Sequence, residues 1–296
     1  TEETGKVAEN LMKDIQWFPG HMTKTRRMIQ ANLSSVDAVV EILDARIPES
    51  SRNPEMDKMT AGKPRMFLLN KSDLASPETT QKWMDYFRKK GIPALAVDCR
   101  SGKGLNKFVP TIRNEVLAEQ IERWNRKGMV GNAVRIMVAG IPNVGKSSFI
   151  NRIAGGKKAQ VADRPGVTRT KQWVRLEKGV ELLDLPGVLW PKFEDQTVAQ
   201  HLAFTGAIKD DIMDIESLAM ILLKYLAANY PNAFERFKFE PDADAEPLAL
   251  LEKVAAKRGM LMSGGVADTE RAAIMVLDEF RSGKLGKISI ESPQEV

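Results

Sequence analysis

Residues 140–147 carry the chemistry that type and spacing reveal most directly, because they read G-x-x-x-x-G-K-S. A short apolar run at residues 134–139 precedes the motif, and residues 147–153 follow it with helical spacing. Strand, loop and helix in this order form the context in which such a loop binds phosphate, through backbone N–H groups and a helix N-terminus. The motif predicts that Lys146 bridges the β- and γ-phosphates of a nucleotide and that Ser147 holds Mg²⁺. The residues expected to contact nucleotide here are Asn143, Val144, Gly145, Lys146, Ser147 and Ser148.

A second motif, N-K-x-D, occupies residues 70–73 at the end of a buried apolar run. A carboxylate at Asp73 can accept hydrogen bonds from N1–H and the 2-amino group of guanine, whereas adenine would leave its charge unpaired. Asn70 is expected to brace the loop and reach the base, while the stem of Lys71 lies across it. Four such residues alone would also suit a polar turn with Asp73 as a helix cap. Together with the phosphate loop, they predict a guanine nucleotide.

Residues 98–102 follow the next expected strand, where a third loop would contact the guanine base. Such a loop usually reads Ser-Ala-Lys, which is absent here. Its task is to offer a backbone N–H to guanine O6, and Cys99, with Arg100 beside it, is expected to supply that group.

Two further stretches suit the triphosphate end of the nucleotide. Residues 184–187 read D-x-x-G, so Asp184 is expected to hold Mg²⁺ through water and the Gly187 N–H to sense the γ-phosphate. Thr168 lies in a polar, basic stretch and is expected to complete the Mg²⁺ coordination, ordering its loop only when triphosphate is bound. A lone threonine in a loop usually has no such role, so this assignment depends on the other motifs.

The elements that must position these residues alternate between strands and helices up to about residue 195, which predicts an α/β fold with a P-loop sheet. Strands are expected at residues 36–44, 65–69, 94–97 and 134–139, with a hairpin at 172–176 and 180–183. Helices are expected at residues 22–32, 77–90 and 105–127, with Trp83 and Phe87 as core residues one turn apart. Beyond residue 196 only helices are predicted, at 198–205, 216–230, 247–258 and 269–281. We therefore expect a flexible tail at 1–13, a nucleotide domain at 14–195 and an all-helical domain at 196–296.

Composition limits the classes of protein. The 44 Lys and Arg residues against 39 Asp and Glu give a net charge of +5, which favours an anionic partner. A single cysteine, Cys99, excludes an internal disulfide framework and a cysteine metal cluster. The sequence contains no apolar run of the roughly 20 residues that a membrane span needs. We expect a soluble cytoplasmic protein that binds no membrane.

The order of the motifs is unusual, because N-K-x-D precedes the phosphate loop and D-x-x-G comes last. An ordinary GTPase runs from phosphate loop to D-x-x-G to N-K-x-D, so the sequence predicts a circularly permuted domain whose original ends are joined by the helix at 105–127. The chain resembles the ribosome biogenesis GTPase A (YlqF) family of circularly permuted GTPases. That resemblance rests on the motifs above and on residues 17–22 (WFPGHM), 44–48 (DARIP), 51–54 (SRNP) and 189–195 (LWPKFED), and it runs from about residue 15 to the end.

The resemblance implies a GTPase that assists late assembly of the large ribosomal subunit, with ribosomal RNA bound by the helical domain. No DNA partner is expected, and the protein is expected to act as a monomer. Basic residues gather toward the C-terminus, although a solvated helix face would look the same. They are Lys253, Lys257, Arg258, Arg271, Arg281, Lys284 and Lys287. Two alternatives stay open, a nucleotide-gated RNA-binding switch whose hydrolysis is incidental and a GTPase acting on the small subunit or tRNA.

Catalysis is the least determined feature of the sequence. Val188 stands where Ras-like GTPases carry the glutamine that orients the attacking water, which predicts intrinsic hydrolysis on the order of 10⁻⁴ s⁻¹ or slower. His21 is a candidate to orient that water, with anchoring or RNA contact as equal alternatives. Asn143 resembles the residue that helps to hold K⁺ in potassium-activated GTPases, although bracing of the loop explains it equally well. GTP and Mg²⁺, with K⁺ as an optional ion, are the expected ligands.

Overall fold

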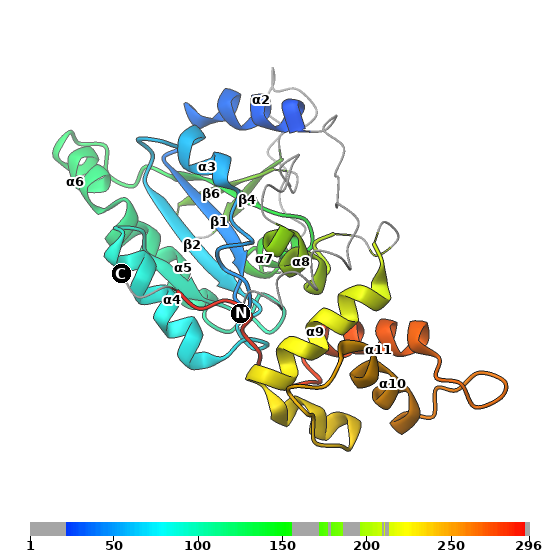
Figure 1. Cartoon of the computed structure of the whole chain (residues 1–296). Helices are drawn as coiled ribbons and strands as arrows, with labels where there is room; N and C mark the ends of the chain where they lie inside the picture. The colour runs from blue at the N-terminus through cyan, green and yellow to red at the C-terminus, as the bar shows by residue number, and fades with distance from the viewer. Residues whose placement is uncertain are drawn as a thin grey trace. The chain divides into compact units, whose positions relative to one another are not determined.

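A computed structural model describes residues 22–155, 172–176, 179–185, 196–208, 210 and 213–293. The chain divides into two compact units (Figure 1). One is an α/β unit, and the other holds the helices of residues 192–288. Residues 289–293, which the sequence analysis grouped with the helical domain, belong to the α/β unit.

The α/β unit is built on a six-stranded sheet in the order β3-β2-β1-β4-β6-β5. The strands are β1 (Ala38–Asp44), β2 (Arg65–Asn70), β3 (Ala94–Ala96), β4 (Val134–Gly140), β5 (Gln172–Leu176) and β6 (Val180–Asp184). All neighbouring pairs are parallel except the β5–β6 hairpin. The predicted α/β class and P-loop sheet are confirmed. Buried parallel strands explain why the apolar runs were continuous rather than alternating.

Helices cover the sheet of the α/β unit (Figure 1). They are α2 (Met22–Leu33), α3 (Pro54–Met59), α4 (Pro77–Lys89), α5 (Phe108–Thr111), α6 (Ala118–Arg126) and α7 (Lys146–Ile153). Trp83 and Phe87 of α4 stack with ring centroids 5.4 Å apart and pack against Phe67 of β2, so their predicted core role is confirmed. Phe108 of α5 meets Phe149 of α7 edge-on at 5.1 Å.

One local prediction was wrong, and one helix was not predicted. The single helix expected at 105–127 is broken into a 3₁₀ turn (Leu105–Lys107), α5, a π-helical turn (Ile112–Val116) and α6. Pro110, which has no N–H to donate, lies inside α5 and disfavours a continuous helix. Helix α3 was not predicted: the Asn53 side chain accepts from the Glu55 N–H and caps a helix that begins at Pro54.

The helical unit contains α8 (Gln196–Phe204), α9 (Ile215–Asn229), a 3₁₀-helix (Pro231–Phe237), α10 (Pro247–Lys257) and α11 (Thr269–Arg281). Asp214 and Asp268 cap the N-termini of α9 and α11 with their side chains. Leucines of α9 and apolar residues of α10 and α11 form a fully buried core. The buried Glu279 of α11 holds the guanidinium groups of Arg236 and Arg258, each at 2.9 Å. In the described part of the chain, no helix has the length and apolar character that crossing a membrane requires.

Candidate functional site

The carboxyl ends of the parallel strands bring the predicted motifs to one edge of the sheet. Asp44 at the end of β1 is in register with Asn70 at the end of β2, and Ile42 is in register with Gly140 of β4. Asp184 ends β6 beside Val138 of β4. In open parallel sheets this edge is where ligands bind. The motifs that begin at Asp44, Asn70, Gly140 and Asp184 are far apart along the chain, but all four therefore lie at the same edge of the sheet.

The phosphate loop turns sharply from β4 into α7. Gly145 has φ +100°, a left-handed conformation that side chains rarely adopt, and Asn143 has φ +58°. A Cβ atom added to Gly145 would lie 2.2 Å from Nδ2 of Asn70, so this position also has no room for a side chain. Helix α7 begins at Lys146, directly after that glycine. The loop thus presents the N-terminus of α7 next to the N-K-x-D motif.

Lys146 and Asp184 meet at the phosphate end of the site. The Lys146 Nζ donates to Oδ1 of Asp184 in a close ion pair. Ser147 and Ser148, the next residues of α7, are exposed. Carboxylate and hydroxyl oxygens are ligands that Mg²⁺ prefers, and Asp184 reaches the N-terminus of α7, where Ser147 stands, so the residues present suit that ion. Within the described residues, no cluster of three or more His, Cys, Asp or Glu side chains forms a protein-only metal site.

Asn70 joins the phosphate loop to the expected guanine loop. Its Nδ2 donates to the carbonyl of Val144 at 2.7 Å, and its Oδ1 accepts from the Cys99 N–H at 3.0 Å. That N–H was expected to bind guanine O6, but in the structure it donates to Asn70. Asp73, three residues beyond Asn70, is exposed. The Asn70 carboxamide therefore fixes the spacing between the two loops, while the Asp73 carboxylate is open to solvent.

Lys71 contacts a buried ion pair, Asp44 with Arg46, which was not assigned a role from the sequence. Its Nζ lies 3.0 Å from Oδ2 of Asp44, and its backbone has φ +59°. The guanidinium of Arg46 donates to both oxygens of Asp44, at 2.9 and 2.8 Å, and both side chains are almost fully buried. Burial alone would raise the pKa of Asp44, but the charges of Arg46 and Lys71 outweigh it and hold that pKa well below its usual range. The residue string DARIP was visible in the sequence, but only the register of β1 and β2 connects it to Lys71.

Arg152 is a second residue that sequence reasoning missed. It lies on α7, and its guanidinium donates to the Ser101 carbonyl in a close contact. A Cβ atom at Gly102 would lie 2.7 Å from Nε of Arg152, so the arginine packs directly over the glycine of the guanine loop. Cys99 of this loop is buried, and burial together with the nearby Asp98 charge raises the pKa of its thiol to about 12. Arg100, in contrast, is exposed.

Three predicted site residues, His21, Thr168 and Gly187, lie outside the described residues, as does Val188. Their roles stay predictions. Every other predicted site residue lies at the carboxyl end of a strand, on the loop that follows such a strand or on the first turn of α7.

Comparison with known proteins identifies the family of this chain. Residues 135–230 match the model described as "50S ribosome-binding GTPase". Ribosome biogenesis GTPase A of Priestia megaterium is 45% identical over 282 residues, which cover 95% of this chain and 98% of that protein. The GNP-bound YlqF structure from T. maritima is 27% identical, with a TM-score of 0.63 over 92% of this chain and 100% of that one. A GDP-bound YlqF structure is 28% identical, with a TM-score of 0.64 over 91% of this chain and all of that one. The permuted motif order, the shared carboxyl edge and this similarity over nearly the whole length place the chain in the ribosome biogenesis GTPase A family.

Proposed function

We propose that this protein is a GTPase that binds the precursor of the large ribosomal subunit, assists its late assembly and hydrolyses GTP on contact with the particle in order to leave. The observation that carries the proposal is the contact of Asn70 with both Val144 and Cys99. That contact supports a single site in which guanine recognition and phosphate binding are joined. The family description, a 50S ribosome-binding GTPase, supports the choice of particle.

In this proposal the chain's own groups bind and orient the nucleotide. Lys146 exchanges Asp184 for the β- and γ-phosphate oxygens, and the backbone N–H groups of residues 143–148 surround the phosphates. Asp73 accepts from the guanine base. Ser147, Thr168 and Asp184 would hold Mg²⁺, which when bound neutralises charge on the phosphates. The Gly187 N–H would report the γ-phosphate.

Two groups are proposed to act on hydrolysis. His21 orients the attacking water, because the valine at 188 cannot form the hydrogen bond that a glutamine would. Asn143, which has a left-handed backbone and an exposed side chain, would help to hold K⁺ against the phosphates. The valine at 188 predicts little turnover without the ribosomal particle.

The helical unit is proposed to bind ribosomal RNA through a narrower set of basic residues than the sequence indicated. Arg258 is paired with Glu279, and Arg281 holds Asp210 at 2.7 Å and the carbonyls of Ala203 and Phe204. These two arginines therefore have structural partners inside the unit. The other basic residues of the set are exposed, and they are Lys253, Lys257, Arg271, Lys284 and Lys287.

The test is GTP hydrolysis by the parent and His21→Ala proteins, with and without purified large subunits, in K⁺ and in Na⁺. We expect strong stimulation by large subunits, loss of that stimulation in His21→Ala with GDP binding intact, and higher rates in K⁺. Absence of stimulation by any ribosomal particle would contradict the enzyme proposal and leave a nucleotide-gated RNA-binding switch, which Val188 favours. Stimulation by small subunits or tRNA alone would contradict the choice of partner.

A further inference from the structure

The last described residues of the chain lie on the α/β unit, close to the guanine-binding motifs. Residues 289–291, named here the tail segment, follow directly after the helical unit. The Ser289 Oγ accepts from the Ser76 N–H at 3.1 Å, and the Ile290 N–H donates to the Arg46 carbonyl at 2.9 Å. The indole Nε1 of Trp83 donates to the carbonyl of Glu291 at 3.2 Å. Ser289 and Ile290 are buried, so the tail segment is part of the packed structure.

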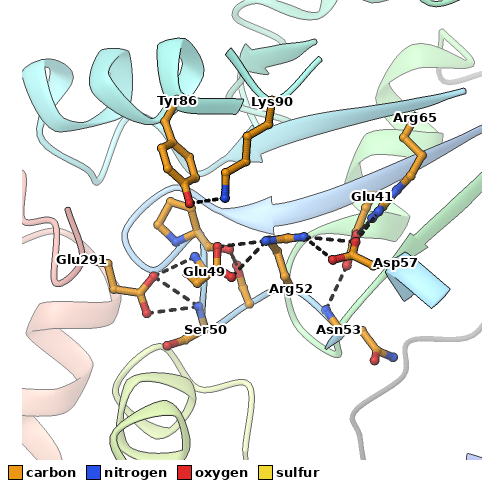
Figure 2. Close-up of polar contacts among 12 residues, drawn as sticks. Glu41, Glu49, Ser50, Arg52, Asn53, Asp57, Arg65, Tyr86, Lys90 and Glu291 are labelled. Atoms are coloured by element: carbon orange, nitrogen blue, oxygen red, sulfur yellow. Dashed lines mark hydrogen bonds and ion pairs between the residues drawn. The ribbon is translucent and has the colours of Figure 1, made fainter. Parts of the chain in front are cut away.

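The carboxylate of Glu291 makes the strongest of these contacts (Figure 2). It accepts from the Glu49 N–H at 2.7 Å and from the Ser50 N–H at 3.1 and 3.2 Å. Both N–H groups belong to residues 45–52, named here the seat loop. Hydrogen bonds from successive backbone N–H groups to a carboxylate are charge-assisted and stronger than neutral ones. The carboxylate therefore fixes the turn of the seat loop.

The seat loop is connected to Lys71 through Asp44. Asp44, which immediately precedes it, pairs with Lys71 and with Arg46. The backbone N–H of Asp44 donates to Oγ of Ser51, which lies in the same loop. Arg46 thus connects the tail segment to Asp44. Its guanidinium donates to Asp44, and its carbonyl accepts from the Ile290 N–H.

A second contact reaches the other end of the N-K-x-D motif. Ser76, whose N–H donates to Ser289, is the N-cap of α4 and lies three residues after Asp73. The tail segment therefore touches the chain on both sides of the base-recognition residues, through the seat loop beneath Lys71 and through Ser76 beyond Asp73.

We propose that the tail segment is a latch that positions the guanine-recognition motif, with Ser289 and Glu291 as positioning residues that slow the release of guanine nucleotide. Residue 288 belongs to the helical unit and residue 289 to the α/β unit, so the latch is the covalent continuation of the helical unit. A ribosomal particle that displaces the latch while binding the helical unit would speed nucleotide release. This inference rests on the proposed guanine-nucleotide binding and deepens it.

The first test compares a chain that ends at Ile288 with one that ends at Pro293, which keeps the latch. The dissociation rate and Kd of fluorescent GDP are measured for both and for the parent protein. We expect the shorter chain to release GDP at least tenfold faster with little change in association rate, and the Pro293 chain to behave as the parent. Equal release rates from a folded Ile288 chain would overturn the latch. Failure of the parent to bind GDP would instead contradict the proposed function.

Point variants keep the test valid if the shorter chain does not fold. Glu291→Ala is expected to speed GDP release severalfold. Glu291→Gln retains an acceptor oxygen, so its GDP release rate is expected to lie between those of Glu291→Ala and the parent. Glu252→Ala removes an exposed carboxylate from α10 and serves as the control, with no expected change.

A double-mutant cycle separates the latch from a simple structural staple. In a Lys71→Met background, which removes the link to Asp44, Glu291→Ala is expected to add little to the release rate. If the tail segment only stabilised the fold, Glu291→Ala would lower the melting temperature in both backgrounds but would leave the rate of GDP release unchanged in each. That result, or full additivity of the two substitutions, would overturn the proposal.

Discussion

Gly145 is the residue on which the geometry of the phosphate loop most depends. Its φ is +100°, and a Cβ atom added there would approach Nδ2 of Asn70 to 2.2 Å, so any side chain is excluded. We expect Gly145→Ala to lower GDP affinity at least a hundredfold, because the alanine must displace either the loop or the Asn70 brace. The measurement is a titration with fluorescent GDP, accompanied by thermal unfolding.

Gly155 supplies the matched control for this change. It also has a positive φ, +71°, but a Cβ there meets no atom within 4 Å. Gly155→Ala should therefore cost only about 1 kcal/mol of stability for the left-handed backbone and leave GDP affinity unchanged. Parent-like GDP binding by Gly155→Ala and Gly145→Ala alike would contradict the tight approach of Asn70.

Cys99 gives a second residue-scale prediction, concerning reactivity. A thiol with a pKa of about 12 has a thiolate fraction at pH 8 roughly a thousandfold below that of an ordinary cysteine, whose pKa is 9.0. We expect alkylation of native Cys99 by iodoacetamide to be much slower than alkylation of the urea-unfolded chain. Fast labelling of the native protein would show that the guanine loop opens readily.

At the scale of the element, strand β1 carries two buried carboxylates whose pKa values shift in opposite directions. Burial raises the pKa of Glu41, although Arg65 and the Asn53 N–H oppose it. Asp44 has its pKa lowered by Arg46 and Lys71 in spite of burial. Arg65 and Arg52 also lower the pKa of Glu41, but they do not outweigh burial, and the nearby Asp57 charge adds to the increase, whereas the cations beside Asp44 outweigh its burial.

These opposite shifts predict opposite effects of pH on unfolding free energy. The contribution of Asp44 is present above about pH 3.9, its unfolded pKa, and is lost as pH falls toward the lower folded value. The contribution of Glu41 is largest below about pH 4.3 and is lost as pH rises through its raised folded pKa. Urea unfolding of the parent, Asp44→Asn and Glu41→Gln proteins between pH 3 and 7 measures both.

We expect Asp44→Asn to cost about 3–5 kcal/mol at pH 7, because Arg46 is left buried without its counter-charge, and less at pH 3. The stability of Glu41→Gln relative to the parent should rise over the same interval. The same pH trend in both variants would contradict the assigned directions.

In the helical unit, Arg281 of α11 stabilises the end of α8. Its guanidinium donates to the carbonyls of Ala203 and Phe204 in the last turn of α8 and pairs with Asp210. A cation at a helix C-terminus is favourable, and unpaired carbonyls are costly when the cation is removed. We expect Arg281→Ala to lower the unfolding free energy by about 2–3 kcal/mol, measured by urea unfolding, while Lys284→Ala, on the exposed surface nearby, changes it by less than about 0.5 kcal/mol.

At the scale of the whole molecule, sequence reasoning worked where structure depends on local patterns. The apolar runs at 65–69 and 134–139 predicted buried strands, and Gly179 between two β-favouring runs predicted the β5–β6 hairpin, which the structure contains. The α/β fold followed from the alternation of strand and helix patterns, and the family followed from the motifs, whose residue types survive permutation, together with their altered order. The limits of the helix expected at 105–127 were wrong because one residue, Pro110, disfavours a continuous helix, and the short helix that Asn53 caps was not predicted.

The contacts that the sequence could not supply are those between distant segments. Lys71 and Asp44 meet only because β1 and β2 are in register, and Arg152 reaches Ser101 across two loops. Glu291 lies on the seat loop although the sequence placed it at the end of a helical domain. Neither hydrophobic periodicity nor a motif predicts such contacts, because they depend on how the whole unit packs.

The net charge of +5 and the exposed basic residues of the helical unit give the prediction at this scale. Phosphate contacts release counterions, so binding to ribosomal RNA should weaken as salt rises. The slope of log K against log salt is proportional to the number of those contacts. We expect the Lys257→Glu, Arg271→Glu double variant to bind large-subunit RNA at least tenfold more weakly and to reduce the slope of log K against log salt by about one to two. The measurement is RNA binding between about 50 and 200 mM salt.

A charge-matched control makes that result specific to the helical unit. Lys82→Glu with Lys89→Glu reverses two exposed charges on α4 of the α/β unit, so it changes net charge by the same amount. If RNA contact depended only on overall charge, both double variants would weaken binding equally. If the helical unit carries the contact, the α4 variant keeps both the affinity and the salt slope, and basic residues there act by position rather than by their contribution to the total charge.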